Sequence, residues 1–177
     1  MYNLQKRLLE LVETENIILD EQENLPSYSL GIYIKDPVMP YPIIGICKNL
    51  CYCEYNSILA EELGHHFTST GTSTALFHHH PGRLTLNKVE ESAIRWGTEF
   101  ALPILHITST IANHLNGTIV DIASELSVTT EFLMHRLRIL SLTQDYIKIN
   151  DTYKLVLCNY PNLHVVRDST QHSILAV

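Results

Sequence analysis

Residues 60–66 read Ala-Glu-Glu-Leu-Gly-His-His and hold the side chains of this sequence that are best suited to chemistry. On an α-helix, Glu61 and His65 are four residues apart and share one face, so both can reach a single metal ion. Glu62 lies one step round the helix, where it could polarise a water molecule on that ion. The pattern corresponds to an H-E-x-x-H helix whose first histidine is replaced by Glu61. We therefore predict a metal centre with Glu61 and His65 as ligands and Glu62 as general base.

Two other interpretations of the same segment stay open. The frame that pairs Glu62 with His66 puts Leu63 in the position of the base, which makes less chemical sense. Alternatively, Glu61 and Glu62 are solvated acids on an amphipathic helix, and the two histidines are polar surface residues.

His66 is interpreted as a neighbour of the metal rather than a ligand. It could complete the coordination sphere or donate a hydrogen bond to the oxyanion of a peptide under attack. A run of three histidines shortly after the helix could do the same, although solvated loop histidines with weak metal affinity are the plainer interpretation; these are His78, His79 and His80.

A second helix, expected over residues 87–102, supplies a further ligand. One stripe of this helix consists of Glu90, Ala93, Ile94, Gly97 and Ala101, and the small residues on it allow close approach to a neighbouring helix. Glu90 at the head of that stripe is predicted as the third, carboxylate ligand. Three protein ligands leave one coordination position open for water.

The remaining elements follow from periodicity and turn residues. We expect helices over 3–15, 57–70 with Asn56-Ser57 as N-cap, 105–115, and two within 118–140 joined by a tight turn at Ser127-Val128. Three short strands within 16–20, 29–35 and 42–48 are expected to form a small meander-like sheet. Residues 71–87 are expected to be loop, and the tail to form a β-hairpin with Asn150-Asp151 at its turn.

The length of 177 residues, of which 45% are hydrophobic, fits one domain with a small appendage. We expect the metal-site domain in residues 1–105, a helical module in 106–145 and a β-hairpin tail in 146–177. No apolar run is long enough to cross a bilayer, and the N-terminus lacks the apolar core of a signal peptide, so a cytoplasmic protein is expected. The four cysteines match no usual zinc spacing and are expected to be reduced thiols on a strand and the loop after it: Cys47, Cys51, Cys53 and Cys158.

Residues 121–137 have the spacing of a helix-turn-helix, the motif that reads DNA with its second helix. The charge argues against that use. The chain carries 12 Lys and Arg against 19 Asp and Glu, a net charge of −7, and residues 116–145 are also net acidic. Because phosphate is held mainly by clustered Lys and Arg, we expect no direct nucleic-acid binding. The unit is interpreted as a packing module or as a dock for a protein substrate.

The segments ILAEELGHHFTSTG (58–71) and KVEESAIRWGTEFALP (88–103) resemble the ImmA/IrrE family of bacterial and phage metallopeptidases, especially its prophage members. The resemblance continues through residues 119–137 and covers most of residues 1–142. It implies an α+β, zincin-like minimal metallopeptidase fold, with a small sheet packed on the metal-site helices and a C-terminal helical module. It also implies Glu61, His65 and Glu90 as ligands, Glu62 as general base, and cleavage of a helix-turn-helix repressor encoded nearby.

One divalent ion is expected, and zinc fits the ligand types best. Two carboxylates and one imidazole formally cancel its charge and weaken it as a Lewis acid, so manganese is the alternative. The expected function is that of a metal-dependent endopeptidase acting on a repressor of a phage or mobile element. The competing expectation is a non-catalytic regulatory protein on the same scaffold that binds a repressor without cleaving it.

Overall fold

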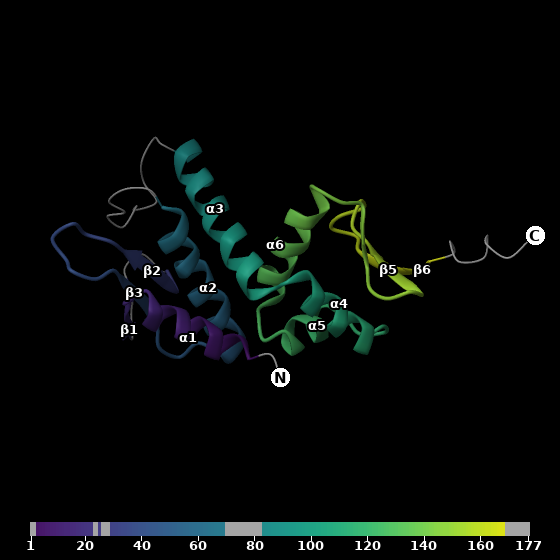
Figure 1. Cartoon of the computed structure of the whole chain (residues 1–177), viewed down its shortest axis with the longest axis horizontal. Coiled ribbons are helices and arrows are strands. Elements are labelled where there is room, and N and C mark those ends of the chain that lie inside the picture. The colour runs from purple at the N-terminus through teal and green to yellow at the C-terminus, as the bar shows by residue number, and fades with distance from the viewer. Residues whose placement is uncertain (1–2, 23–24, 26–28, 70–82, 169–177) are drawn as a thin grey trace, which may run out of the picture.

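The computed structural model of the chain describes residues 3–22, 25, 29–69 and 83–168. Within them, six helices and two small sheets form an α+β fold, as expected (Figure 1). The helices are α1 (Leu4–Thr14), α2 (Tyr52–Thr68), α3 (Arg83–Ala101), α4 (Ile104–Asn113), α5 (Ile119–Glu125) and α6 (Thr130–Ser141). The strands are β1 (Ile18–Gln22), β2 (Gly31–Ile34), β3 (Ile43–Cys47), β4 (Tyr146–Lys148), β5 (Tyr153–Val156) and β6 (His164–Arg167).

The N-terminal sheet has the order β1-β3-β2, with β3 parallel to β1 and antiparallel to β2. The expected meander is therefore wrong, because β3 lies between the two strands that precede it. The burial of its side chains explains this position. Ile44 and Ile46 of β3 are completely buried, whereas most of β1 is exposed. The most apolar strand takes the centre, where both of its neighbours shield it from water.

Helix α2 begins at Tyr52, with Cys51 as its N-cap, and so starts earlier than the predicted cap at Asn56-Ser57. The Glu54 carboxylate accepts a hydrogen bond from the Cys51 backbone N–H at 2.8 Å, which satisfies a donor at the helix start. Asn56 and Ser57 are buried inside the helix instead. Cys53 is likewise helical, rather than part of a loop.

The buried polar side chains of α2 hold the turn between α5 and α6. The Asn56 side-chain amide donates to the carbonyl of Ser127 at 3.0 Å, and the Thr129 backbone N–H donates to the Ser57 hydroxyl at 2.9 Å. Ser127 has a φ of 61°, in the left-handed region, as expected of a residue that reverses the chain between two helices. The predicted turn at Ser127-Val128 is confirmed, and it is anchored to α2.

Helices α2 and α3 pack at very close range. A Cβ added to Gly64 would lie 2.1 Å from the carbonyl oxygen of Ala93, and one added to Gly97 would lie 2.5 Å from that of Ala60. The predicted stripe of small residues is thus confirmed as the contact face of α3. The helix begins at Arg83, so the predicted loop through residue 87 is too long.

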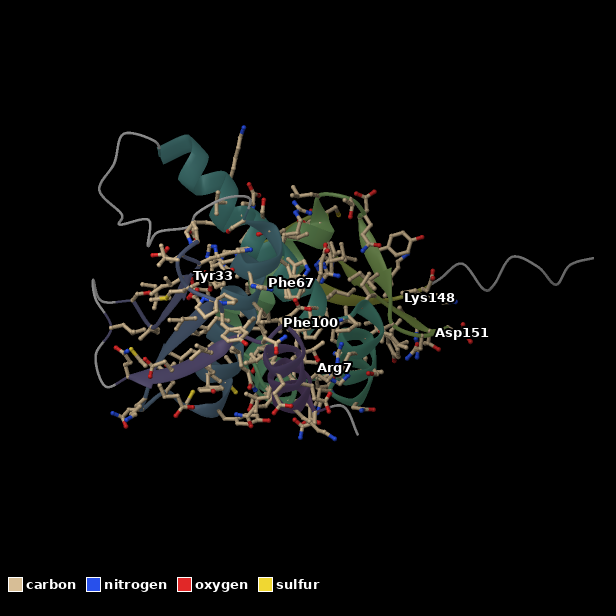
Figure 2. The ribbon with its side chains drawn as sticks, turned by 60° about the vertical axis from the view of Figure 1, so that its left-hand side comes forward. Arg7, Tyr33, Phe67, Phe100, Lys148 and Asp151 are labelled. Atoms are coloured by element: carbon tan, nitrogen blue, oxygen red, sulfur yellow. The ribbon has the colours of Figure 1, made fainter. Side chains whose placement is uncertain are left out.

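The C-terminal sheet has the order β4-β5-β6, all antiparallel. The predicted hairpin is confirmed for β4 and β5, and the Asn150 side chain accepts hydrogen bonds from the backbone of Thr152 and Tyr153 in its turn. Strand β6 extends the hairpin to three strands. Figure 2 shows Lys148 and Asp151 of this hairpin far from Tyr33 and Phe67 of the N-terminal half.

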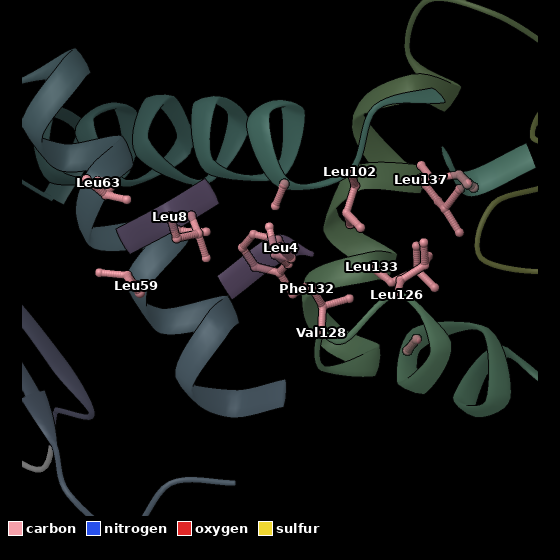
Figure 3. Packing of buried hydrophobic residues seen from close by; sticks show 14 of the residues in the cluster. Leu4, Leu8, Leu59, Leu63, Leu102, Leu126, Val128, Phe132, Leu133 and Leu137 are labelled. Carbon is pink, nitrogen blue, oxygen red and sulfur yellow. The ribbon is translucent and has the colours of Figure 1, made fainter. Parts of the chain in front are cut away.

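The buried hydrophobic side chains form one cluster that runs from Leu4 of α1 to Leu157 after β5. Figure 3 shows this continuity, from Leu8 of α1 and Leu59 of α2 to Leu133 and Leu137 of α6. The cluster has members on both sides of residues 105 and 145, the positions at which the sequence suggested domain boundaries. In the part of the chain that the structure describes, no helix has the length and apolar character needed to span a membrane.

Candidate metal centre

Three potential ligands converge where α2 packs on α3. Glu61 and His65 come from α2 and Glu90 from α3, and one ligand atom from each lies within 4.8 Å of the others. His65 Nε2 and Glu90 Oε2 are 3.2 Å apart. The close packing of the two helices places Glu90 near Glu61 and His65. The contacts that hold the α3 backbone against α2 lie one to two turns after Glu90, at Ala93 and Gly97. The structure therefore brings together all three ligands that the sequence predicted.

This donor set fits a divalent ion. One imidazole nitrogen and two carboxylate oxygens are ligands that zinc and manganese both accept. In a tetrahedral zinc site with bonds of about 2.0–2.1 Å, ligand atoms lie about 3.3 Å apart, close to the His65–Glu90 separation. His65 is largely buried, whereas Glu90 is half-exposed, so one side of the site faces solvent.

The charges of the site favour a cation. Burial raises the pKa of Glu61; His65 opposes this shift, and the carboxylates of Glu90 and Glu131 add to it. Burial lowers the pKa of His65, but its hydrogen bond to Glu90 and the surrounding carboxylates outweigh burial and leave the pKa raised. The raised pKa of His65, and the smaller contributions of Glu90 and Glu131 to that of Glu61, reflect the negative charge around these ligand atoms, and a bound cation would relieve this repulsion.

Glu62 is buried, with an exposed fraction of 8%, and lies against strand β2. A Cβ added to Gly31 of that strand would come 2.6 Å from Glu62 Oε1, so the glycine makes the room that this carboxyl group occupies. Burial raises the pKa of Glu62 to about 8; His65 opposes the shift, and the charges of Glu61 and Glu90 reinforce it. The carboxyl group is thus electrostatically coupled to all three potential ligands. The sequence contained no signal for the part that Gly31 plays.

His66 contacts side chains of two other elements. Its Nδ1 lies 3.1 Å from the Tyr33 hydroxyl on β2, and its Nε2 lies 3.4 Å from a Glu15 oxygen just after α1. His66 therefore joins α1, α2 and β2 rather than approaching the three ligands. The run His78, His79 and His80 lies outside the described residues.

An aromatic row continues from His66 across α2 and α3. Phe67 stacks on Trp96 at 4.4 Å, Trp96 stacks on Phe100 at 5.3 Å, and the Arg7 guanidinium lies 4.7 Å above the Phe100 ring. Phe67, Phe100 and Arg7 are labelled in Figure 2. These contacts stabilise the pair of helices that carries the ligands. The four cysteines are free, and within the described residues none of them belongs to a cluster of three potential ligands.

A cleft of about 580 Å³ adjoins the three ligands, and Glu61 and Glu90 line it. Helix α6 forms another wall, through Glu131, Phe132, His135 and Arg138. The amino-acid sequence contains no signal for this wall. The spacing of Glu131, His135 and Arg138 does place them on one helical face, but nothing in the sequence showed that this face meets the metal site.

The two arginines of α6 are directed at α3. Arg136 is buried and donates from Nε to the carbonyl of Leu102 at 3.2 Å and from Nη1 to Glu99 at 3.1 Å. Arg138 donates to Glu91 at 3.5 Å. The second helix of the helix-turn-helix look-alike thus uses its permanent cations for packing, which supports its interpretation as a packing module.

Comparisons of the chain with known protein families, with curated proteins and with solved structures found no match.

Proposed function

We propose that the protein is a metal-dependent endopeptidase. The observation that carries the proposal is the convergence of Glu61, His65 and Glu90 from two separate helices. Two of the three, Glu61 and Glu90, also line a cleft large enough to hold a segment of peptide. Glu61 is only partly exposed and lies near a carboxylate of a second helix, which the interpretation as solvated surface acids does not predict. The resemblance of residues 58–71 and 88–103 to the ImmA/IrrE family points the same way.

In this proposal, Glu61, His65 and Glu90 hold one divalent ion, zinc or manganese. When bound, such an ion polarises the scissile carbonyl and makes water more acidic. Glu62 takes the proton from the water that adds to the carbonyl carbon and delivers it to the leaving nitrogen as the C–N bond breaks. Its burial between α2 and β2 keeps the carboxyl group in one position for both transfers.

The proposed substrate is a helix-turn-helix repressor of a phage or mobile element, so the protein would act as an anti-repressor in the cytoplasm. This part of the proposal rests on the family resemblance. The fold adds that the helix-turn-helix look-alike forms part of the cleft wall, where it would contact a bound protein rather than DNA.

Metal content tests the ligand set first. Gently purified wild-type protein and Glu62→Gln should each contain or take up about one equivalent of divalent metal by inductively coupled plasma analysis. His65→Ala and Glu90→Gln should lose it. Glu91→Gln, which changes the adjacent carboxylate on α3, is the matched control and should retain the metal. Wild-type protein that neither retains nor takes up stoichiometric metal contradicts the proposal.

Co-expression with the helix-turn-helix repressor encoded beside the gene tests the reaction. The proposal expects a discrete repressor fragment with wild-type protein and with Glu13→Gln, an exposed control on α1, and none with Glu62→Gln. Stable co-purification with intact repressor would instead support the non-catalytic binding protein.

A further inference from the structure

The cleft beside the metal ligands is strongly acidic. Among the residues that the structure describes, five carboxylates line it, from Glu54, Glu61, Glu90, Glu91 and Glu131, against a single permanent cation, Arg138. Arg138 is paired with Glu91. With Glu61 and Glu90 neutralised by a divalent ion, two carboxylates, Glu54 and Glu131, remain without a compensating cation among the described residues.

These two acids differ in what they already bind. Glu54 accepts the backbone N–H of Cys51 at the start of α2, so its carboxylate has a structural role there. Glu131 lies in the first turn of α6, is exposed, and has no ion-pair partner within the described residues. Its charge acts on Glu61 across the cleft, which places the α6 wall within electrostatic reach of the metal ligands.

The cleft is also lined by apolar side chains, on which the methylene stem of a bound lysine or arginine could pack. Ile58 of α2, Ile94 of α3 and Phe132 of α6 all face the cleft. Phe132 is almost completely buried, so the partly exposed apolar surface of the cleft comes from Ile58 and Ile94, and Glu131 lines the same cleft. A long side chain with a methylene stem and a positive end matches both features, because the stem packs on apolar surface while the charged end reaches the acid.

We propose that this cleft selects peptide segments that carry an arginine or lysine beside the bond to be cleaved, and that Glu131 is the residue that recognises the positive charge. The position of the basic residue relative to the bond rests on the proposed peptidase function; the preference for a basic peptide rests on the cleft alone. Helix α6 then has a specificity role, and it recognises protein by charge.

A binding experiment tests the charge preference without turnover. The full-length Glu62→Gln protein, supplied with Zn²⁺, is titrated against fluorescein-labelled Ala/Leu hexapeptides that carry one central arginine or its neutral analogue citrulline. The arginine peptide should bind about tenfold more tightly, the scale of one charge-assisted hydrogen bond. When Glu131→Gln is added, the ratio of the affinities for the arginine and citrulline peptides should fall to less than about threefold. Glu125→Gln, an exposed acid on α5 outside the cleft, should leave it unchanged.

Equal binding of the two peptides, binding of neither, or the same loss of preference with Glu125→Gln overturns the inference. A second measurement separates this outcome from failure of the peptidase. Wild-type protein with Zn²⁺ is incubated with a mixed peptide library, and the cut sites are read by mass spectrometry. Arg or Lys enriched at one position beside the cut, and lost in Glu131→Gln, supports the inference. Cutting with no basic preference overturns it and leaves the peptidase standing, whereas arginine-selective binding without cutting supports the acidic cleft and contradicts the peptidase.

Discussion

At the scale of single residues, the site gathers three carboxyl groups, Glu61, Glu62 and Glu90, around one imidazole. In the absence of a cation, burial and mutual repulsion make it costly to ionise the two that lie deepest, Glu61 and Glu62. The fold maintains this arrangement because the backbones of α2 and α3 are fixed by close packing, whatever the charge of the side chains. Ion-free protein therefore carries an electrostatic strain that depends on pH.

Glu62→Gln should stabilise the metal-free protein at alkaline pH. The pKa of Glu62 is about 8 in the folded state against an ordinary value of 4.5, so between these values the folded state holds a proton that the unfolded state has lost. The free energy of unfolding of the wild type therefore falls as the pH rises through that window, by on the order of 4 kcal/mol in all. The neutral amide removes this fall.

Thermal unfolding in the presence of a chelator measures the effect. At about pH 8.5, Glu62→Gln should exceed the wild type in Tm by about 5 °C or more, and at about pH 5 the advantage should vanish. The exposed control Glu13→Gln should follow the wild type at both values. A pH-independent difference between Glu62→Gln and wild type would show that Glu62 does not hold a proton in the folded state.

The protonation of His65 predicts that the affinity for metal rises with pH, whereas the free energy of unfolding falls with pH. The pKa of His65 is raised in the ion-free protein, and the imidazole must lose its proton to bind a metal. Metal binding should therefore release protons, and the affinity should increase with pH through the range in which His65 titrates. Calorimetric titration with Zn²⁺ in two buffers of different ionisation enthalpy measures this release. Equal heats in the two buffers would contradict it.

Among single residues, the sequence predicted those whose positions follow from one helix or one stripe. Glu61 and His65 share a face by their spacing alone, and Glu90 followed from the small residues that allow close helix packing. The setting of Glu62 could not be predicted, because it depends on Gly31, a glycine that is near it only once β2 packs on α2. The contacts of His66 with Tyr33 and Glu15 could not be predicted either, because they also depend on tertiary packing.

At the scale of elements, the metal centre depends on how closely α2 and α3 approach. Each helix presents a glycine to an alanine of the other, Gly64 to Ala93 and Gly97 to Ala60. The ligands lie on both sides of this contact, so the separation of the helices sets the separation of the ligand atoms. A wider crossing would leave Glu90 out of reach.

Gly97→Ala should therefore damage stability and metal binding together. The new methyl group would lie 2.5 Å from a backbone oxygen of Ala60, which cannot move aside as a flexible side chain would. We expect a loss of about 1–3 kcal/mol in the free energy of unfolding and a markedly weaker affinity for Zn²⁺. Denaturant unfolding and metal titration measure the two effects. Ser92→Ala, on the exposed side of α3, should leave both intact, and unchanged Zn²⁺ affinity in Gly97→Ala would contradict this account of the site.

The elements themselves were predictable to different degrees. Helices with a clear apolar period, such as α1, were found from the sequence, whereas the order of the N-terminal strands was not. The central place in a sheet goes to the strand that is most completely buried. The burial of β3 results from its contacts with α2, β1 and β2, which are tertiary contacts that the sequence pattern does not reveal. The start of α2 was misplaced because Asn56 and Ser57 resemble a cap, yet they bind the α5–α6 turn.

At the scale of the whole molecule, the distribution of charge argues against binding of nucleic acid by the C-terminal helical module. The chain has a net charge of −7, and α6 directs Arg136 and Arg138 at α3. Little positive charge is left on that helix for phosphate. An electrophoretic mobility shift assay at low salt should show no tight binding of duplex DNA, because attraction to phosphate dominates such binding. A tight, sequence-specific shift would overturn the interpretation of this unit as a packing module.

The continuous core makes a last prediction about cooperativity. Leu133 of α6 is completely buried in the cluster that also contains Leu8 and Leu59. Leu133→Ala should cost about 2–5 kcal/mol and lower the Tm by roughly 5–15 °C. Because one core joins the module to the metal-site helices, the transitions seen by far-UV circular dichroism and by fluorescence of Trp96, the single tryptophan, should shift together. Val120→Ala, at a 59% exposed position on α5, should change neither. A circular dichroism transition that moves while the Trp96 signal stays in place would show that the module unfolds independently of the helices that carry the metal ligands.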